Sequence, residues 1–252
     1  IISNNFLLHT HMKILIFIIT YKASFRVNKI MKEIPFDYLK KFNYKILISD
    51  DCSNDDTKDY IDQIKKNNKK NIVTNFNSTN LGYGGNIKKC IKYAYKNKFD
   101  IAAMIHGDNQ YSAKYLKEMI VLLTKNDCAA VSGSRMMKKK LARKGGMPFY
   151  KFIGNILLTK YFNFLQNTSF TDCHTGYWVY NLRKIKKKWI EKLDNGFLFD
   201  LDVRLKLVQK KLTVKEVSIL TRYGTERSSM HITYATRFFV RTFVNKVLFF
   251  FK

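Results

Sequence analysis

Short apolar runs alternate with longer amphipathic segments along the first half of the chain. The runs are rich in β-branched residues, as in parallel strands that are buried on both faces. They occupy residues 13–20, 44–49, 71–76, 101–106 and 129–134. Between them, apolar residues recur at helical spacing, for example Ile87, Cys90, Ile91 and Ala94. Strands that alternate with helices predict an α/β fold, with a mainly parallel central sheet and helices on both of its faces.

The pattern changes after Arg135. A basic loop leads into a helix predicted from Pro148 to about residue 165, and a later strand is predicted within 212–220. No linker-like stretch rich in Gly, Pro or Ser separates the two halves. We therefore predict one domain, residues 12–230, made of two lobes at 12–135 and 136–230.

The last segment, residues 231–252, has the pattern of an amphipathic helix. Its apolar positions fall at i, i+3, i+4, i+7, i+8 and i+11, and they are Val240, Phe243, Val244, Val247, Leu248 and Phe251. Its polar positions are Arg237, Arg241 and Asn245. Such a helix either packs on its own domain or lies on a membrane surface. Extra phenylalanines and flanking cations favour the membrane surface, and no run reaches the roughly 18 apolar residues of a membrane span.

Composition narrows the class of protein. The chain has 252 residues, 46% of them hydrophobic and 15% aromatic, which excludes a disordered chain. The net charge of +27 fits an anionic partner, although a sequence rich in Lys, Asn and Ile also arises from an AT-rich genome. Four widely spaced cysteines argue against a zinc site and suit a reducing, cytoplasmic location. Met12 resembles a natural start, so residues 1–11 are expected to be a disordered or non-native leader.

The polar loops of the first half follow the carboxyl ends of the predicted strands, where ligands bind in open α/β sheets. Asp50 and Asp51 end the second strand, and a carboxylate there accepts hydrogen bonds from a ribose hydroxyl or a base imide. The alternative is an ordinary turn rich in Asp and Asn.

The stretch "MIHGDNQY" offers three metal-capable side chains at alternate positions, His106, Asp108 and Gln110. A sparse set of this kind suits Mg²⁺ or Mn²⁺ completed by substrate phosphates. If strand geometry continues, the three side chains face one crevice, and Gly107 leaves room for a diphosphate. The alternative is a capped helix start with an incidental histidine.

Further along, Arg135 ends the fifth strand and has the fork of donors that suits a phosphate. Its alternative is a salt-bridge partner. Asp172 and His174 interrupt an apolar, aromatic segment, and either is a candidate general base. A structural Asp in a turn is the alternative for Asp172.

In order, these motifs resemble the family 2 glycosyltransferases, most closely the branch of dolichol-phosphate mannosyltransferase and related polyprenyl-phosphate sugar transferases. The resemblance covers nearly everything from Met12 to Ser229. It is carried by the stretches "FIITYKAS", "ISDDCSNDDT", "NLGYGGNIKKCIKYA", "IHGDNQYSAKYL", "GSR", "GGMPFYKFIGNILLT", "TDCHTGYWVY", "GFLFDLDV" and "EVSILTRYGTERSS".

The resemblance implies a GT-A fold, a UDP- or GDP-sugar donor, a divalent cation, and transfer with inversion to a polyprenyl phosphate or a saccharide hydroxyl. The lobe 12–135 would then bind the nucleotide and 136–230 the acceptor, on the cytoplasmic face of an anionic membrane. The residues implied in the nucleoside pocket are Thr20, Tyr21, Asp50 and Asp51, with Asn80 and the Gly82–Gly85 loop closing on base or ribose. Those implied at the metal and diphosphate are Asp108, Gln110 and Arg135, and Asp172 falls in the acceptor segment.

Two departures from the family pattern stand out, since His106 replaces an acidic residue and Trp178 replaces a cation. Two other classes remain as alternatives. A nucleotidyltransferase would have a Gly-rich loop after its first strand, and "TYKAS" has no glycine. A basic membrane- or nucleic-acid-binding module would not explain acidic residues at strand ends, which repel a phosphate backbone, so no nucleic-acid partner is expected.

Overall fold

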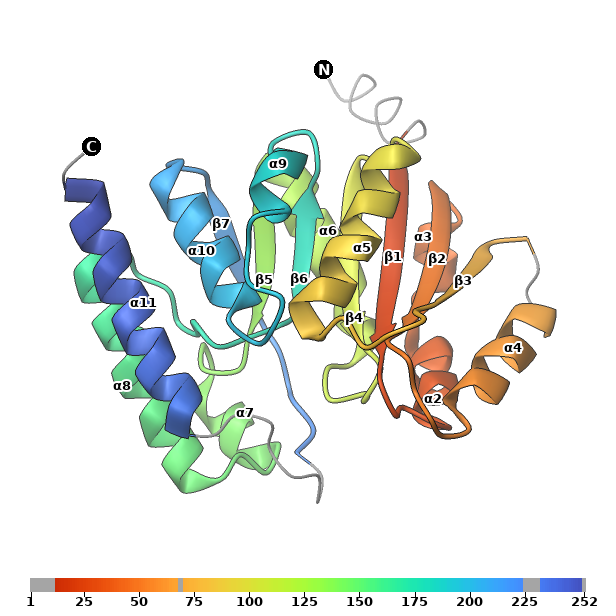
Figure 1. The fold of residues 1–252 in the computed structure, drawn as a ribbon, viewed down its shortest axis with the longest axis horizontal. Coiled ribbons are helices and arrows are strands. Elements are labelled where there is room, and N and C mark those ends of the chain that lie inside the picture. The colour runs from red at the N-terminus through yellow and green to blue at the C-terminus, as the bar shows by residue number, and fades with distance from the viewer. Residues whose placement is uncertain (1–11, 68–69, 224–231, 251–252) are drawn as a thin grey trace.

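A seven-stranded sheet forms the centre of the molecule (Figure 1). The computed structural model describes residues 12–67, 70–223 and 232–250. The strands are β1 (Lys13–Thr20), β2 (Asn43–Asp50), β3 (Ile72–Phe76), β4 (Ile101–His106), β5 (Ala130–Ser134), β6 (Trp178–Asn181) and β7 (Val214–Ser218). Their order across the sheet is β3-β2-β1-β4-β6-β5-β7. Only β6 runs antiparallel to its neighbours, β4 and β5, so the predicted, mainly parallel sheet is confirmed.

Helices cover both faces of this sheet, as predicted. The helical elements are α2 (Arg26–Glu33), α3 (Phe36–Leu39), α4 (Thr57–Asn67), α5 (Tyr83–Lys96), η1 (Ala113–Tyr115), α6 (Leu116–Lys125), α7 (Lys139–Lys144), α8 (Phe149–Gln166), α9 (Lys187–Ile190), α10 (Phe199–Gln209) and α11 (Ile232–Phe250). Alternate β1 residues enter opposite cores. Ile16 packs with the helices α2, α4 and α6, and Phe17 packs with α5 and α10. The five predicted strands are short and mostly apolar because both faces of the sheet are covered, although β3 at the sheet edge is only partly buried.

Strands from both predicted lobes share the one sheet. β6, which no sequence pattern indicated, lies between β4 and β5, and β7 pairs with the outer edge of β5. The boundary between the predicted lobes stays a prediction, because the sheet is continuous across it.

Two helices form an outer layer at one end of the molecule. α8 and α11 lie side by side beyond α10 (Figure 1). Phe162 of α8 and Phe238 of α11 are buried in one cluster with Leu201 of α10. The polar side of α11 also faces inward, since Arg241 forms a bidentate pair with Asp202 of α10 at 2.7 and 2.9 Å. α11 thus packs on its own domain while its apolar stripe points away from the domain, and the membrane-surface alternative stays a prediction.

The outward surface of this pair is apolar, and we call it the α8–α11 face. Its exposed side chains are Phe149, Tyr150, Ile153, Leu157 and Phe164 on α8, and Phe239, Val240, Phe243, Val244, Val247 and Leu248 on α11. Phe251 and the leader 1–11 lie outside the described residues. Among the helices of the described ranges, none is both long and apolar enough to cross a membrane.

The packing of α11 predicts opposite effects for two of its phenylalanines. Phe238→Ala should lower the free energy of unfolding by about 3–5 kcal/mol, because the ring is fully buried. Phe243→Ala on the same helix should change it by about 0.5 kcal/mol or less, because that ring is 52% exposed. Urea unfolding followed by circular dichroism measures both, and equal effects would contradict the orientation of α11.

Candidate functional site

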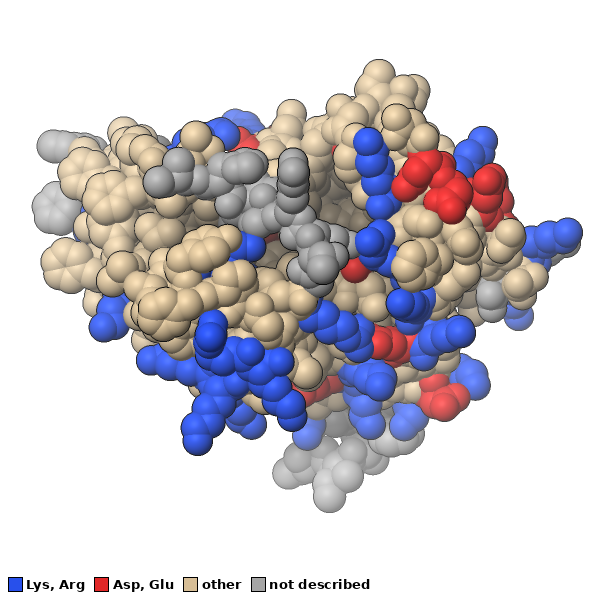
Figure 2. Space-filling view, turned by 90° about the horizontal axis from the view of Figure 1, so that it is seen from below, with Lys and Arg blue, Asp and Glu red and all other residues tan. Residues whose placement is uncertain are grey.

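The loops that follow β1, β2, β4 and β5 converge at the carboxyl ends of the parallel strands, the lower end of the sheet in Figure 1. Figure 2 looks onto this end, where Lys and Arg side chains form groups within a largely uncharged surface. The sequence predicted that the site residues gather here.

Asp50 is the last residue of β2 and holds the loop that follows. One of its oxygens, Oδ1, accepts hydrogen bonds from the hydroxyls of Thr20 and Ser53 at 2.9 and 2.6 Å. The other, Oδ2, accepts the Ser53 backbone N–H at 2.8 Å. Thr20 and Asp50 are both buried, whereas Tyr21 is exposed beside them. Thr20, Tyr21 and Asp50 therefore lie together at this corner, but both Asp50 oxygens are used in hydrogen bonds that hold the loop.

Asp51 ties the next loop to the same corner. Its Oδ1 accepts the Asn77 amide at 2.8 Å and the Leu81 backbone N–H at 2.9 Å. The Asn80 amide donates to the Asp51 carbonyl at 3.2 Å, and its Oδ1 accepts the Gly82 N–H at 2.9 Å. These bonds fix the start of the glycine-rich turn before α5.

The glycines of that turn are approached by the protein itself. Gly82 has φ 78°, and a Cβ there would lie 2.8 Å from the Asn195 carbonyl. A Cβ on Gly84 would meet the Asp194 carbonyl, and the Gly85 N–H donates to Asn195 O at 3.0 Å. The sequence suggested that the Gly82–Gly85 loop closes on base or ribose. The structure gives a second reason for these glycines, because the loop before α10 passes close to their backbone.

His106 ends β4 and is held by two partners. Its Nε2 lies 2.8 Å from the Gly176 carbonyl and 3.2 Å from the Tyr83 hydroxyl, which in turn donates to Asp200 Oδ2 at 2.8 Å. A carbonyl only accepts, so Nε2 carries the ring proton. Burial lowers the pKa of His106, and the ring is neutral at pH 7. The lone pair on Nδ1 is then the only one with which His106 can bind a metal.

Strand geometry does not continue past His106, which differs from the expectation. The chain turns at Asn109, with φ 59°, and Asp108 Oδ1 accepts the Gln110 N–H at 2.9 Å. Gly107 was expected to leave room for a diphosphate, but a Cβ there would lie 2.7 Å from the Thr20 side chain, so the glycine makes room for the end of β1. Residues 106, 108 and 110 therefore do not face one side as they would in a strand, because the chain turns here.

One exposed carboxylate remains at this tip. Asp108 is exposed, and Gln110 follows with an amide oxygen. Among the described residues, no three His, Cys, Asp or Glu side chains cluster as a metal cage. Mg²⁺ and Mn²⁺ are commonly held by one or two carboxylates together with substrate phosphates. The donors at Asp108 and Gln110 fit a cation that arrives with a diphosphate.

Arg135 and Asp172 form a buried ion pair rather than an open site. The guanidinium donates from Nε to Asp172 Oδ2 at 2.7 Å and from Nη2 to Oδ1 at 2.9 Å. Burial by itself raises the pKa of Asp172, but the adjacent charge and hydrogen bonds of Arg135 more than reverse this and hold it well below its usual range. Arg135 was expected to reach a phosphate, and here its fork is occupied by the carboxylate.

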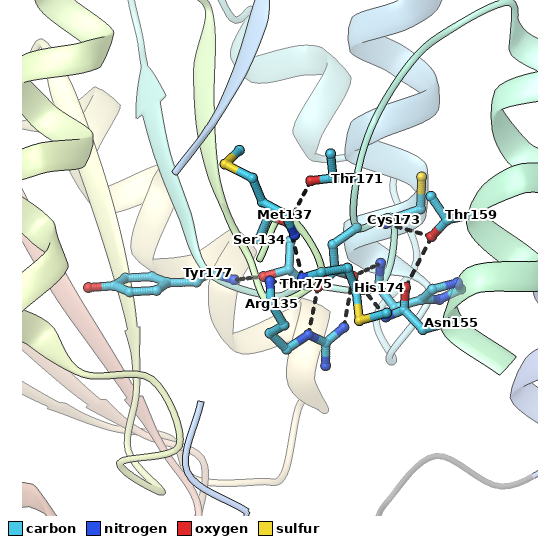
Figure 3. Close-up of polar contacts among 12 residues, drawn as sticks. Ser134, Arg135, Met137, Asn155, Thr159, Thr171, Cys173, His174, Thr175 and Tyr177 are labelled. Carbon is cyan, nitrogen blue, oxygen red and sulfur yellow. Dashed lines mark hydrogen bonds and ion pairs between the residues drawn. The ribbon is translucent and has the colours of Figure 1, made fainter. Parts of the chain in front are cut away.

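Further groups converge on the same carboxylate, and Figure 3 shows two of them, Asn155 and His174, close to Arg135. Asp172 Oδ1 also accepts the Asn155 amide from α8 and the His174 backbone N–H, both at 3.0 Å. Arg204 donates to the Asp172 carbonyl at 3.1 Å, and Glu216 accepts the Asp172 N–H at 3.2 Å. A carboxylate with this many donors and a depressed pKa has little tendency to take a proton, which disfavours Asp172 as a general base.

His174 is also poorly placed as a base. Burial lowers its pKa to about 3, so the ring is neutral at pH 7. Its Nδ1 lies 3.5 Å from the Tyr234 hydroxyl, and its ring packs on Phe238 with centroids 4.4 Å apart. Helix α11 thus covers this side chain.

Sequence reasoning missed the residues that support these groups. Tyr83 and Asp200 hold His106, while the guanidinium of Arg204 lies between the rings of Phe170 and Trp178, 4.4 and 4.7 Å from their centroids. Trp178 stands where the family pattern has a cation, and the guanidinium of Arg204 lies beside its ring. Acidic and basic residues in the apolar stretch "GFLFDLDVRL" were the available signal.

The raised pKa of Asp200 makes the stability of the fold depend on pH near neutrality. Burial raises its pKa to about 7, and the hydrogen bond from Tyr83 offsets only part of this. Because the folded pKa exceeds the unfolded value of about 4, the stabilising contribution is complete below that value and is lost as pH rises through 7.

Asp200→Asn should therefore flatten the dependence of unfolding free energy on pH between about 4 and 7, as measured by urea unfolding at a series of pH values. Asp59→Asn, at an exposed position on α4, should leave that dependence unchanged. A variant at Asp200 whose stability still falls in parallel with that of the parent chain would contradict the assignment.

Comparison with known proteins identifies the family. The model of glycosyl transferase family 2 matches residues 16–189, which is more than half of the chain. An uncharacterized protein of Methanocaldococcus jannaschii is 24% identical over 205 residues, covering 76% of this chain and 82% of that protein.

Two solved structures share the fold. Mycobacterium tuberculosis glucosyl-3-phosphoglycerate synthase, in complex with Mn²⁺, UDP and phosphoglyceric acid, is 11% identical with a TM-score of 0.66, over 98% of this chain and 82% of that one. S. aureus TarS in complex with UDP-GlcNAc is 14% identical with a TM-score of 0.56, over 94% of this chain. This chain spans 66% of the length of that TarS structure. From the family match and the sheet, the chain belongs to glycosyl transferase family 2 and is a glycosyltransferase of the GT-A fold.

Proposed function

We propose that this enzyme transfers a sugar, with inversion, from a UDP- or GDP-sugar to the phosphate of a polyprenyl phosphate. The observation that carries the donor side is the family match over residues 16–189. The similar structures named above hold UDP or UDP-GlcNAc, which supports a uridine nucleotide first.

The nucleotide would sit against the loops after β1 and β2. Thr20, Asp50 and Asp51 build the wall of this corner, and Tyr21 and Asn80 lie at its rim. Because the Asp50 oxygens are used within the loop, we assign direct contact with the nucleoside to exposed Tyr21 and to backbone groups. The acidic residues then act by shaping the pocket.

The diphosphate would lie at the tip of β4. Asp108 and Gln110 would hold Mg²⁺ or Mn²⁺ there, with the neutral His106 ring behind them. When bound, the cation neutralises charge on the leaving diphosphate. His106 and Tyr83 fix the position of this tip relative to the loop at Gly176.

A phosphate acceptor is favoured over a saccharide hydroxyl by the state of the two candidate bases. A hydroxyl needs a base as it attacks, whereas a phosphate is already anionic and needs positioning. Asp172 is fully engaged with Arg135, and His174 has a pKa of about 3. The alternative, transfer to a saccharide hydroxyl in surface polysaccharide synthesis, would have to recruit Asp200, whose pKa of about 7 suits a base.

The acceptor also bears on location. A polyprenyl phosphate is anchored in a bilayer, so this function places the enzyme peripherally on the cytoplasmic face of a membrane. The apolar α8–α11 face supports that location.

The donor and the metal can be tested together by thermal shift. A panel of UDP- and GDP-sugars with Mg²⁺ or Mn²⁺ should raise the melting temperature for one preferred donor, because binding to the folded state stabilises it by mass action. Asp108→Ala should abolish the metal-dependent part of the shift and reduce turnover by about two to three orders of magnitude. Asp37→Ala, at a 97% exposed side chain on α3, is the matched control. Normal metal-dependent turnover in the Asp108 variant would refute its role.

The class of acceptor can be tested through Asp200. With a phosphate acceptor, Asp200→Asn should change turnover less than about tenfold, because no base is required. With a hydroxyl acceptor deprotonated by Asp200, the same change should cost about two to four orders of magnitude. Product analysis by mass spectrometry, with undecaprenyl phosphate and a short oligosaccharide offered in parallel, reports the acceptor directly.

A further inference from the structure

The α8–α11 face is a single surface formed by two parallel helices. Phe239 stacks on Tyr161 with ring centroids 4.0 Å apart, and the Gln166 side chain donates to the Thr242 carbonyl at 3.1 Å. The contact that comes later in α8 also comes later in α11, so the two helices run in the same direction (Figure 1). The exposed side chains of α8 and α11 lie on either side of this seam.

Exposed apolar side chains are concentrated here rather than scattered. Eleven of the seventeen large hydrophobic side chains that are exposed in the described residues belong to the α8–α11 face. Phe164 is 85% exposed and Leu157 is 61% exposed, although α8 buries Phe162 on its other side. Isolated exposed hydrophobics are normal on a monomer, but a contiguous group marks a surface that binds something apolar.

The charges around this face specify an anionic partner. From Met136 to Phe170 the chain contains no acidic residue. Helix α7 and the residue before it contribute Lys138, Lys139, Lys140, Arg143 and Lys144, all exposed. In Figure 1, α7 lies at the end of α8 and α11 that is nearest the carboxyl edge of the sheet. Figure 2 shows a dense group of Lys and Arg side chains beside uncharged surface at this end.

A second copy of the chain fits this surface poorly. Pairing two such faces side by side would bring two acid-free, cationic rims together, within chains that each carry a net charge of +27. A bilayer with anionic headgroups satisfies both features at once, because acyl chains take up the aromatic and aliphatic side chains and headgroups pair with the lysines.

We propose that α8 and α11 together form a membrane-docking surface that inserts its aromatic and aliphatic side chains into an anionic bilayer, with α7 as its electrostatic rim. The proposal adds α8 and α7 to the C-terminal helix that the sequence alone indicated. It rests on the proposed function and deepens it, since it would hold the enzyme at the bilayer in which a polyprenyl phosphate is anchored.

The experiment uses the full chain, with no donor or acceptor present, in co-sedimentation with vesicles. Vesicles of phosphatidylcholine alone are compared with vesicles that also contain phosphatidylglycerol. The parent chain should bind the anionic vesicles and lose affinity as salt is added. The double variant Leu157→Glu and Phe164→Glu should bind at least about tenfold more weakly, because it places two carboxylates on the inserted face.

Two further variants separate the apolar and electrostatic contributions. Lys139→Glu with Lys140→Glu should weaken binding to anionic vesicles and reduce its salt dependence. Phe25→Glu, at another exposed aromatic residue near the start of α2, should bind like the parent chain. Circular dichroism and melting temperature confirm that each variant is folded.

Each outcome decides the proposal. Equal vesicle binding by the folded Leu157/Phe164 variant and the parent chain would overturn it. Concentration-dependent dimerisation that the same variant abolishes, without vesicle binding, would assign the surface to a second copy instead. Sugar transfer to detergent-solubilised polyprenyl phosphate that persists without vesicle binding would reject only the docking surface. Vesicle binding with transfer only to a saccharide would reject only the proposed acceptor.

Discussion

The buried pair between Arg135 and Asp172 is the contact around which the second half of the molecule is arranged. It joins the end of β5 to the segment before β6, and Asn155 adds α8 to the same carboxylate. Charges this deeply buried are tolerated only when every partner is in place, and removing one partner costs about 3–5 kcal/mol. The pair therefore fixes where the 170–174 segment lies, and with it the strand β6 that follows.

This constraint also shapes the chemistry of the site. A carboxylate that accepts this many hydrogen bonds has little tendency to take a proton, and the phosphate acceptor proposed above rests on this point. The same segment connects the site to the outer helices, because His174 packs under Phe238 of α11, and Arg241 of α11 holds Asp202. The helices that carry the apolar face and the residues that border the site thus belong to one packed unit.

Much of the architecture could be predicted from the sequence because it depends on local pattern. The apolar runs at 13–20, 44–49, 71–76, 101–106 and 129–134 became strands, since a short β-branched run has few other ways to be buried. Ordered motifs across those strands identified the family, and the amphipathic period identified α11. The positions of acidic residues at strand ends predicted a site at the carboxyl edge of the sheet, and the structure brings the loops that carry them to that edge.

The sequence alone determined the strand–helix alternation of the first half and the family, and it predicted which edge of the sheet carries the site. Only the tertiary structure decided that β6 inserts between β4 and β5, that Asp172 binds Arg135, and that Gly107 and Gly84 make room for the protein's own chain. It also decided that α8 completes the apolar face of α11. The physical reason is that periodicity is set by neighbours along the chain, whereas the partner of a buried charge or an exposed helix face is set by residues far away in sequence.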